Sequence, residues 1–207
     1  MPMDSLSVYK ALRRKIIHLE LAPESVLNLS DLAHEFKVSR TPIKEALLTL
    51  QAEEWILRQG SHFMVTPLSL ERVREITEIR MQLEPQANVW AMQRITPEEM
   101  AELKALEAGI RNFDASTPNT EIVEYDFSIH HHIFVCAKNA QLARLLERLL
   151  RHYLRFWLAI PRSIERDDFF AEHRALFQAL EAKDEAAVRE STTRHIRNSV
   201  AEIMGTR

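Results

Sequence analysis

The chain has 207 residues, 46% hydrophobic and 28% charged, which is typical of a globular protein and too apolar for a disordered one. Its three glycines lie far apart, which excludes the glycine-rich loops that bind nucleotide phosphates. The single cysteine, Cys136, excludes an internal disulfide and paired-cysteine metal motifs, and no apolar run is long enough for a secretion signal or membrane span. We therefore expect a mainly helical protein in the cytoplasm, with no contact to a membrane.

The net charge of −3 is unevenly divided along the chain. Residues 1–67 hold eight Lys and Arg against eight Asp and Glu, whereas residues 68–207 hold nineteen against twenty-two. Any affinity of the first part for nucleic acid must therefore come from the local placement of basic side chains, because its overall charge is zero.

The hydrophobic periodicity of the first 54 residues predicts three helices. The first spans residues 7–19, the second begins near Ser30, and the third contains Pro42. Proline is tolerated only in the first turn of a helix, so Ser39 or Thr41 is expected to cap the third one.

After the third helix the pattern changes to two short β-like runs. These runs, residues 55–57 and 63–65, are joined by a polar turn at residues 58–62, which is typical of a small hairpin. Two helices joined by a turn and followed by a hairpin predict a winged helix-turn-helix. We place this DNA-binding domain at residues 1–67.

The third helix has the side chains that DNA recognition needs. Arg40 and Lys44 lie four residues apart on one face, where they could reach the major groove. Ser39 and Thr41 lie beside the helix N-terminus, where hydroxyls and free backbone N–H groups can hold a phosphate. A capped helix on an ordinary protein surface would give the same pattern, but the following hairpin favours DNA binding.

From residue 68 to the end, the apolar pattern is helical throughout. It predicts six segments, at residues 69–93, 97–113, 119–138, 140–159, 167–182 and 184–203. The fold class is therefore mainly α, with a winged helix-turn-helix followed by an all-α bundle of about six helices at residues 68–207.

Four polar residues fall on the apolar stripes of three of these segments. Asp126 and His130 share the inner face of the 119–138 segment, while His173 and His195 lie in the stripes of the last two. Three imidazoles and a carboxylate could bind a first-row divalent ion and leave open positions for a further ligand. Alternatively, each could be a core side chain hydrogen-bonded to a neighbour. The spacing alone leaves both interpretations open.

One stretch of the first domain carries a specific resemblance. The string VSRTPIKEALLTLQAEEWI is similar to the signature of the GntR family of bacterial transcription regulators, and the resemblance covers residues 8–66. It implies that Arg40 and Lys44 face bases or phosphates, and that the wing tip near His62 contacts the minor groove or the backbone.

The chain departs from this family at four positions. Relatives usually have arginine where Lys44 stands and glycine where Glu54 and His62 stand, and often glycine at Lys37. Lysine at position 44 keeps the positive charge of the usual arginine but cannot form its bidentate hydrogen bonds with guanine. A wing that carries His62 is expected to differ in shape.

The second part resembles the FCD effector domain of the FadR-like branch of that family, in its shorter VanR-like form. The resemblance rests on the motif Asp126-x3-His130, on Asn139, on Glu172-His173 and on a histidine twenty-two residues later. It implies that a divalent metal, most often zinc, nickel or manganese, is held by four side chains: Asp126, His130, His173 and His195.

In such domains a small organic acid can complete the metal's coordination shell. The resemblance makes Arg80 and Asn139 candidates for binding this effector. From the residues alone, Arg80 could equally form a salt bridge on a helix surface, and Asn139 could be a helix C-cap.

The leading hypothesis is a ligand-responsive transcription regulator rather than an enzyme. Each protomer of a homodimer would read one half of a palindromic operator in double-stranded DNA, and a carboxylate metabolite would change the placement of the two DNA-binding domains. A purely structural metal site is a variant of this hypothesis.

The alternative is a metal-dependent hydrolase with a fused DNA-binding domain, because such a metal site can also activate water. Against this alternative, the sequence shows no general base on the same helix faces as the expected metal ligands. Glu172 lies one residue before His173 on the same predicted helix. Its side chain should therefore point about 100° away from the helix face that carries His173.

Overall fold

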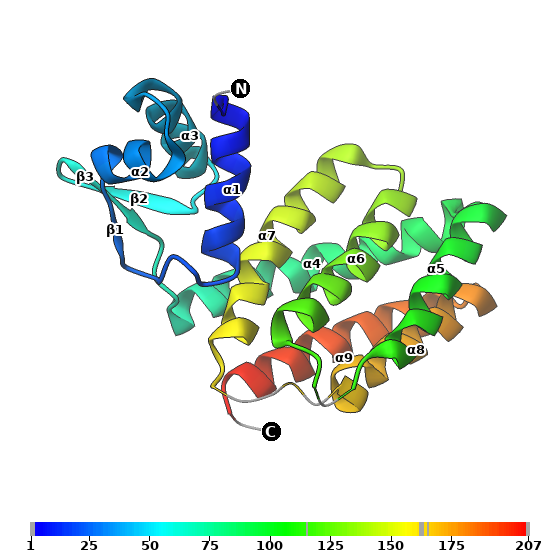
Figure 1. Ribbon diagram of the computed structural model, residues 1–207. Coiled ribbons are helices and arrows are strands. Elements are labelled where there is room, and N and C mark those ends of the chain that lie inside the picture. Colours follow the sequence, from blue (N-terminus) through cyan, green and yellow to red (C-terminus); the bar gives the residue numbers. More distant parts are fainter. Residues whose placement is uncertain (1–2, 115, 162–163, 165, 206–207) are drawn as a thin grey trace. The chain divides into compact units, whose positions relative to one another are not determined.

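The computed structural model describes residues 3–114, 116–161, 164 and 166–205, and it divides into two compact units. Met1–Ser69 form the first unit, here called the head, and Leu70–Arg207 form the second, called the body. Figure 1 shows a mixed unit of helices and short strands followed along the chain by a unit of helices. Each unit has its own buried apolar cluster.

The head contains the three predicted helices and a small antiparallel sheet. Its elements are α1 (Ser5–Ile17), β1 (Val26–Leu27), α2 (Leu29–Phe36), α3 (Arg40–Ala52), β2 (Ile56–Gln59) and β3 (His62–Val65). The strand order is β1-β3-β2, so that the predicted hairpin forms one side of the sheet. β1 pairs Val26 with Met64 and was not predicted, because two residues are too few to show an alternating pattern.

The core of the head fixes α3 with one face inward. Ile43, Leu47 and Leu50 of α3 are fully buried, together with Leu12 of α1. Because helical side chains repeat every 3.6 residues, this packing leaves the opposite face of α3 in solvent. Ser39 occupies the N-cap position, as one of the two predicted residues, although its side chain makes no capping hydrogen bond.

Two of the departures from glycine lie where the backbone adopts the left-handed conformation. Lys37, which ends α2, has φ 53°, and Glu54 has φ 64°. The chain thus keeps a conformation that favours glycine while carrying larger side chains there. His62 is different, because it lies in β3 opposite Gln59, and Gly60 provides the left-handed residue of the wing turn with φ 60°.

The body has six α-helices in its described residues. They are α4 (Leu70–Arg94), α5 (Pro97–Gly109), α6 (Asn119–Cys136), α7 (Ala140–Ala159), α8 (Arg166–Ala182) and α9 (Glu185–Ile203), with the short 3₁₀ turn η1 (Ile110–Asn112) after α5. Thr96 and Glu99 form a reciprocal capping box at the start of α5. The side chains of Asn139 and Asp184 cap the N-termini of α7 and α9. Both residues lie at breaks in the apolar pattern, where the sequence predicts that helices start.

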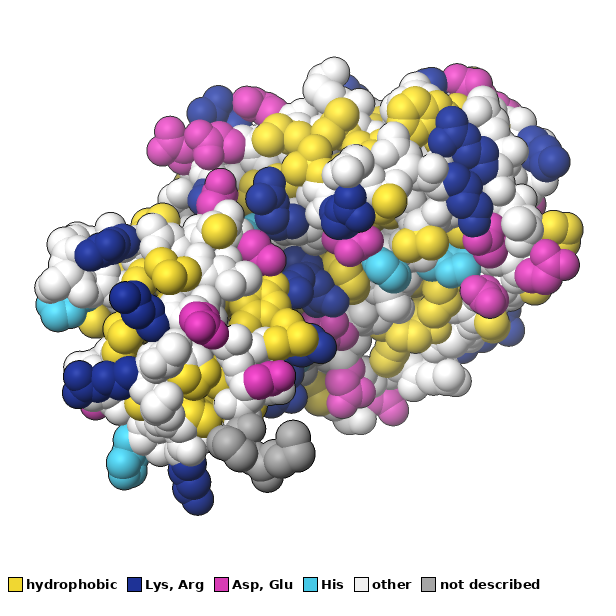
Figure 2. Space-filling model, turned by 90° about the horizontal axis from the view of Figure 1, so that it is seen from above, with side chains coloured by type: hydrophobic (Ala, Val, Ile, Leu, Met, Phe, Trp, Pro, Cys, Tyr) yellow, Lys and Arg dark blue, Asp and Glu magenta, His cyan; other side chains and the backbone are white. Residues whose placement is uncertain are grey.

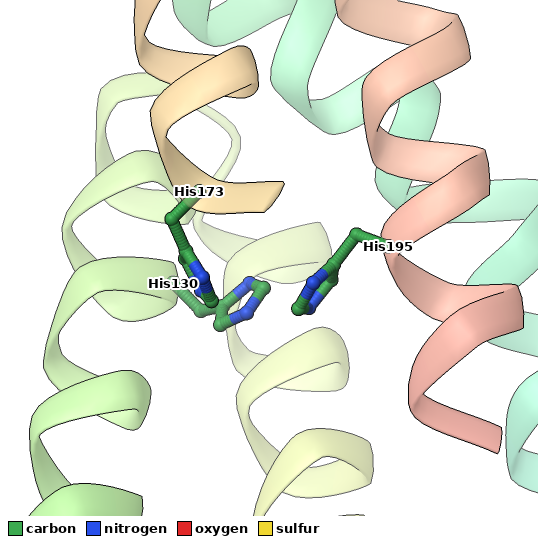
Figure 3. A group of neighbouring side chains, drawn as sticks. All are labelled: His130, His173 and His195. Atoms are coloured by element: carbon green, nitrogen blue, oxygen red, sulfur yellow. The ribbon is translucent and has the colours of Figure 1, made fainter. Parts of the chain in front are cut away.

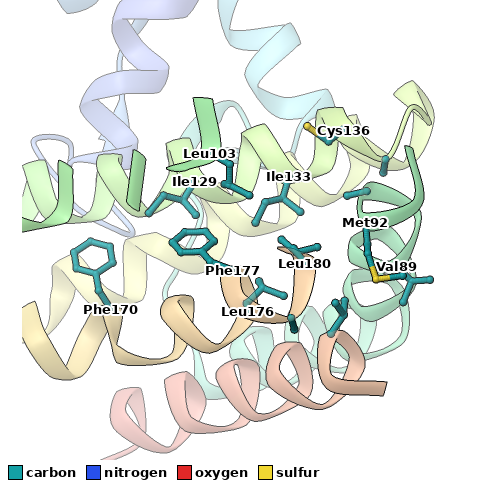
Figure 4. Close-up of a cluster of buried hydrophobic side chains, with 14 of the residues drawn as sticks. Val89, Met92, Leu103, Ile129, Ile133, Cys136, Phe170, Leu176, Phe177 and Leu180 are labelled. Carbon is teal, nitrogen blue, oxygen red and sulfur yellow. The ribbon is translucent and has the colours of Figure 1, made fainter. Parts of the chain in front are cut away.

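The buried apolar cluster of the body draws on α4, α5, α6, α8 and α9. Figure 4 shows Val89 and Met92 of α4 and Ile133 of α6 packed near Leu180 of α8, with Leu103 of α5 beside them. α4 also lies against α9, α6 and α7. Polar side chains on these helices that face the interior therefore contact other protein groups rather than water. No described helix is both long and apolar enough to cross a membrane.

Lys37→Gly is expected to raise the free energy of unfolding by about 0.5–1 kcal/mol, because glycine adopts φ 53° without a side-chain clash. Urea unfolding of the full chain measures the change. Lys10→Gly, inside α1, is the matched control and should lower stability by about 1 kcal/mol. A loss of stability in both variants would contradict the argument.

Candidate functional site

Three histidines from three helices converge inside the body. Figure 3 shows the rings of His130 (α6), His173 (α8) and His195 (α9) turned toward one another. Their ring centroids are 5.3 Å apart for His130–His173, 5.1 Å for His130–His195 and 4.7 Å for His173–His195. One nitrogen from each lies within 4.8 Å of the others, which is close enough for a shared metal ion.

Asp126 lies at the edge of this cluster, one helical turn before His130. Its Oδ1 is 2.9 Å from Nε2 of His173 and 3.7 Å from Nε2 of His130. The structure thus brings together all four residues that the sequence predicts as ligands. They come from α6, α8 and α9, so the cluster exists only when these three helices pack correctly.

Three of the four side chains are buried with few of the partners that burial normally requires. Asp126 is 3% exposed, His130 2% and His173 1%. Both ring nitrogens of His130 and Nδ1 of His173 lack a hydrogen-bond partner, and the 2.9 Å contact between Oδ1 of Asp126 and Nε2 of His173 is the one close polar contact of these two atoms. Core histidines satisfied by their neighbours would not leave these atoms unpaired. The donor set therefore fits a bound cation better than it fits a closed protein network.

The local electrostatics favour the protonation states that a metal needs. Burial lowers the pKa of His195 well below its usual value, and the nearby His173 and His130 lower it further. Burial also lowers the pKa of His130, against the opposing charge of Asp126. Burial would raise the pKa of Asp126, but His130, His173 and Arg80 outweigh it, so its pKa is lowered. Neutral imidazoles and an ionised carboxylate are the forms that bind metal ions.

Arg80 of α4 forms a buried ion pair with Glu84, one turn later on the same helix. Arg80 is 1% exposed and Glu84 is 0% exposed, and Nη2 of Arg80 donates to Oε2 of Glu84 at 3.3 Å, while Nε donates to Oε1. Burial opposes the charge on Arg80, but Glu84 outweighs it and raises the pKa of the guanidinium. The alternative of a salt bridge on a helix surface for Arg80 is wrong, because Arg80 and its partner are both buried. Glu84 was missed, although its i,i+4 spacing from Arg80 is visible in the sequence.

A cavity beside the histidines is lined by Arg80, Asp126 and His195 and by the aromatic residues Tyr153, Trp157 and Phe169, as well as by polar side chains of α8 and α9. Arg80 is among the lining residues, and its buried Nη1 has no hydrogen-bond partner. Convergent polar groups on an apolar and aromatic wall are typical of small-molecule sites.

The expectation that Glu172 points away from the ligands is wrong. Glu172 lines the same cavity, and its Oε2 lies 3.7 Å from Nδ1 of His195. The spacing of residues along α8 alone does not reveal this contact, because α9 supplies the histidine that Glu172 faces.

Asn139 is not brought to this cavity. Its side chain accepts a hydrogen bond from the backbone N–H of Leu142 at 3.1 Å and caps the start of α7. The alternative of a C-cap is also wrong, because the residue begins a helix rather than ending one.

In the head, the predicted DNA-contacting side chains are all exposed. These residues are Ser39, Arg40, Thr41, Lys44 and His62. Nη2 of Arg40 donates to the hydroxyl of Ser30 at 2.9 Å, which holds the guanidinium at the junction of α2 and α3. In Figure 2 the Lys and Arg side chains of the head stand apart from one another on the visible face. This distribution fits a unit of zero net charge whose basic groups act by position.

The fold and the site define a winged helix-turn-helix protein with a helical body built around a polar cluster. The profile of the bacterial regulatory proteins of the gntR family matches residues 4–62, and the profile of the FCD domain matches residues 75–198. The chain belongs to the gntR family of bacterial transcription regulators and carries an FCD effector-binding domain.

Relatives match the chain along most of its length. The HTH-type transcriptional regulator YdhC of Bacillus subtilis is 28% identical over 194 residues, covering 92% of this chain and 86% of the relative. McbR, an HTH-type transcriptional regulator of Escherichia coli, is 25% identical over 204 residues, covering 95% and 91%. The HTH-type transcriptional repressor RspR of Escherichia coli is 27% identical over 195 residues, covering 91% and 84%.

The solved structure of E. coli McbR/YncC has the same fold, with a TM-score of 0.85, 23% sequence identity and coverage of 99% of both chains. These relatives are named as regulators of transcription and not as enzymes. The hydrolase alternative is therefore rejected.

Glu84→Gln is expected to lower the free energy of unfolding by about 3 kcal/mol, because it leaves the charge of Arg80 buried without its counterion. Glu78→Gln is the matched control. It removes the partner of Arg74 from an exposed i,i+4 pair on the same helix and should change stability by less than about 0.5 kcal/mol. Urea unfolding measures both variants. An equal loss of unfolding free energy in the two would contradict the argument that burial makes the loss of Glu84 costly.

Proposed function

We propose that this regulator senses a small organic acid through a divalent metal bound in its body. The metal ligands are Asp126, His130, His173 and His195, and the effector enters the cavity beside them. The observation that carries the proposal is the convergence of three imidazoles and a carboxylate whose buried polar atoms have few hydrogen-bond partners. One ion would bind one nitrogen of each ring together with the carboxylate.

The donor chemistry selects among metals. Imidazole nitrogens suit zinc, nickel and other first-row ions, whereas magnesium and calcium prefer shells made of oxygen. A single carboxylate beside three imidazoles also suits manganese. We therefore expect zinc, nickel or manganese, each with at least one coordination position left for an exogenous oxygen ligand.

A carboxylate is the effector group that best fits this position. The metal and Asp126 together carry one positive charge, which an incoming carboxylate would neutralise. Arg80 contributes a hydrogen bond through Nη1, since Glu84 already balances its charge. The aromatic wall formed by Tyr153 and Trp157 would contact the apolar part of the effector.

The head reads DNA with the exposed face of α3. Arg40 and Lys44 would contact base edges or phosphates, and Ser39 and Thr41 would hold a phosphate at the helix N-terminus. His62 on β3 is placed on the wing, where it would contact the backbone. Such a protein works in the cytoplasm as a homodimer on a palindromic operator, because two-fold symmetry in the protein matches two half-sites.

Regulation requires the effector to bind two arrangements of the heads with different affinity. A structural metal would raise the melting temperature without any further effect of acids. An effector site would show an additional, metal-dependent effect of the acid on melting and on operator affinity.

His130→Ala is expected to abolish tight metal binding, because it removes one of the three imidazoles of the cluster. His131→Ala is the matched control on the same helix: its side chain is 47% exposed and pairs with Glu147, so metal binding should be retained. Calorimetric titration with Zn²⁺, Ni²⁺ and Mn²⁺ measures both, and circular dichroism checks that each variant is folded. Stoichiometric, tight metal binding by folded His130→Ala would exclude this ligand set.

Incubation of the protein with sheared genomic DNA from its source should enrich a short palindrome. Arg40→Ala is expected to weaken binding to that sequence about tenfold or more with little loss of stability, because the side chain is exposed. Arg194→Ala, which removes an exposed arginine from α9, should leave affinity unchanged. Unchanged affinity in Arg40→Ala as well would mean that another face reads the operator.

A further inference from the structure

The cavity beside the metal ligands contains a carboxylate that the proposed function does not use. Glu172 of α8 lines it, and the side chain is 15% exposed. Its Oε1 accepts a hydrogen bond from the side-chain amide of Asn198, and its Oε2 faces Nδ1 of His195 at 3.7 Å. The amide is neutral, and an imidazole that binds a metal ion is neutral as well. Neither of these two side chains therefore brings Glu172 a positive charge of its own. With a divalent ion bound, the charges of the ion, Asp126 and Glu172 would sum to zero, and this balance suits an effector with no net charge.

Among the side chains that the structure describes around the cavity, Arg80 does not balance Glu172 either. Arg80 is a lining cation, but both of its interactions with carboxylate oxygens go to Glu84, and this pair is neutral as a unit. Its guanidinium carbon also lies 4.4 Å from the ring centroid of Tyr153. A partly buried carboxylate with only neutral partners carries a desolvation cost that a cation would offset.

The aromatic wall suits a cation at the same place. Phe169 and Trp157 both line the cavity and meet edge to face, with ring centroids 4.8 Å apart. Nε1 of Trp157 is occupied by its hydrogen bond to Ser199 at 3.1 Å, so the ring contributes its apolar and π surface. Aromatic faces attract ammonium groups, and a neighbouring carboxylate adds to that attraction.

The same charges disfavour an effector with two carboxylates. A first carboxylate can bind the metal, but a second one would approach Glu172 and be repelled by it. The cavity therefore combines one place for an anion, at the metal, with one place for a cation, at Glu172.

We propose that the effector is a zwitterion whose carboxylate completes the metal shell and whose ammonium group, or a comparable cationic nitrogen, binds Glu172. This inference rests on the proposed metal and carboxylate function, and it names the effector class more narrowly. Glu172 acts as the residue that distinguishes amino acids from plain carboxylic acids.

Calorimetry on the Zn²⁺-loaded full chain with matched pairs of ligands tests the proposal. Each pair differs only by the amine: β-alanine and propionate, 4-aminobutyrate and butyrate, 5-aminovalerate and valerate, and 4-(aminomethyl)benzoate and 4-methylbenzoate. The amine is kept away from the α-carbon so that it cannot chelate the metal together with the carboxylate. In at least one pair the amino acid should bind about tenfold tighter or more, as a charge-assisted hydrogen bond provides.

Variants of Glu172 then assign the preference to this side chain. Glu172→Gln keeps an acceptor for Asn198 but removes the charge, and it should abolish the preference for the amino acid without weakening the plain acid. Glu172→Asp keeps the charge and should retain part of the preference. Glu190→Gln, an exposed glutamate on α9, is the matched control and should behave as the parent protein. Zn²⁺ affinity is measured first for every variant, since Glu172 adjoins His173.

The outcomes separate the two proposals. Metal-dependent binding of plain acids with no gain from the amine would overturn the zwitterion and leave the carboxylate function standing. A preference that survives in metal-loaded Glu172→Gln would overturn the role of Glu172. If neither member of any pair binds while Zn²⁺ does, the carboxylate function itself fails, and the zwitterion proposal fails with it.

Discussion

The cost of burying polar groups organises the body of this protein. Asp126, His130 and His173 are almost fully buried among the helices, yet several of their atoms have no hydrogen-bond partner. In an apolar interior each such atom costs free energy comparable to a lost hydrogen bond. Helices α6, α8 and α9 place these atoms together, so a single ion could bind one nitrogen of each imidazole and the carboxylate. Other buried atoms of the body, such as Oδ1 of Asn88, also lack a partner, but they do not converge in this way.

The buried pair of Arg80 and Glu84 obeys the same constraint in a different way. There the two charges neutralise each other within one helix, and only Nη1 of Arg80 remains without a partner. Such a pair contributes little net stability compared with apolar residues, but loss of one member is costly. The pair fixes the guanidinium of a residue that lines the cavity. A lysine could not replace it, because a single ammonium cannot hold Glu84 and still offer a separate planar N–H group.

Much of the fold could be predicted from the sequence because the signals are long and periodic. The six helices of the body and the three of the head show apolar stripes, and breakers such as Thr96-Pro97 coincide with helix starts. β1 could not be predicted, because two residues carry no period and the strand exists only through its pairing with β3. The four clustered site residues could be predicted because inward polar residues are rare. Glu172 and Asn139 were misjudged because one depends on the neighbouring helix and the other on a helix boundary.

The link between the cavity and the DNA-reading head has a covalent component. α4 begins at Leu70, directly after the head, and extends to Arg94, with Pro85 inside it after Arg80. Arg80 lies ten residues along this helix, which corresponds to about 15 Å of rise. A helix transmits displacement along its axis because its backbone hydrogen bonds resist local bending. An effector that contacts Arg80 therefore acts on the same rigid element that leads into the head. Coupling follows only if the effector binds one position of α4 more tightly than another, and among the described residues that line the cavity Arg80 is the one that belongs to α4.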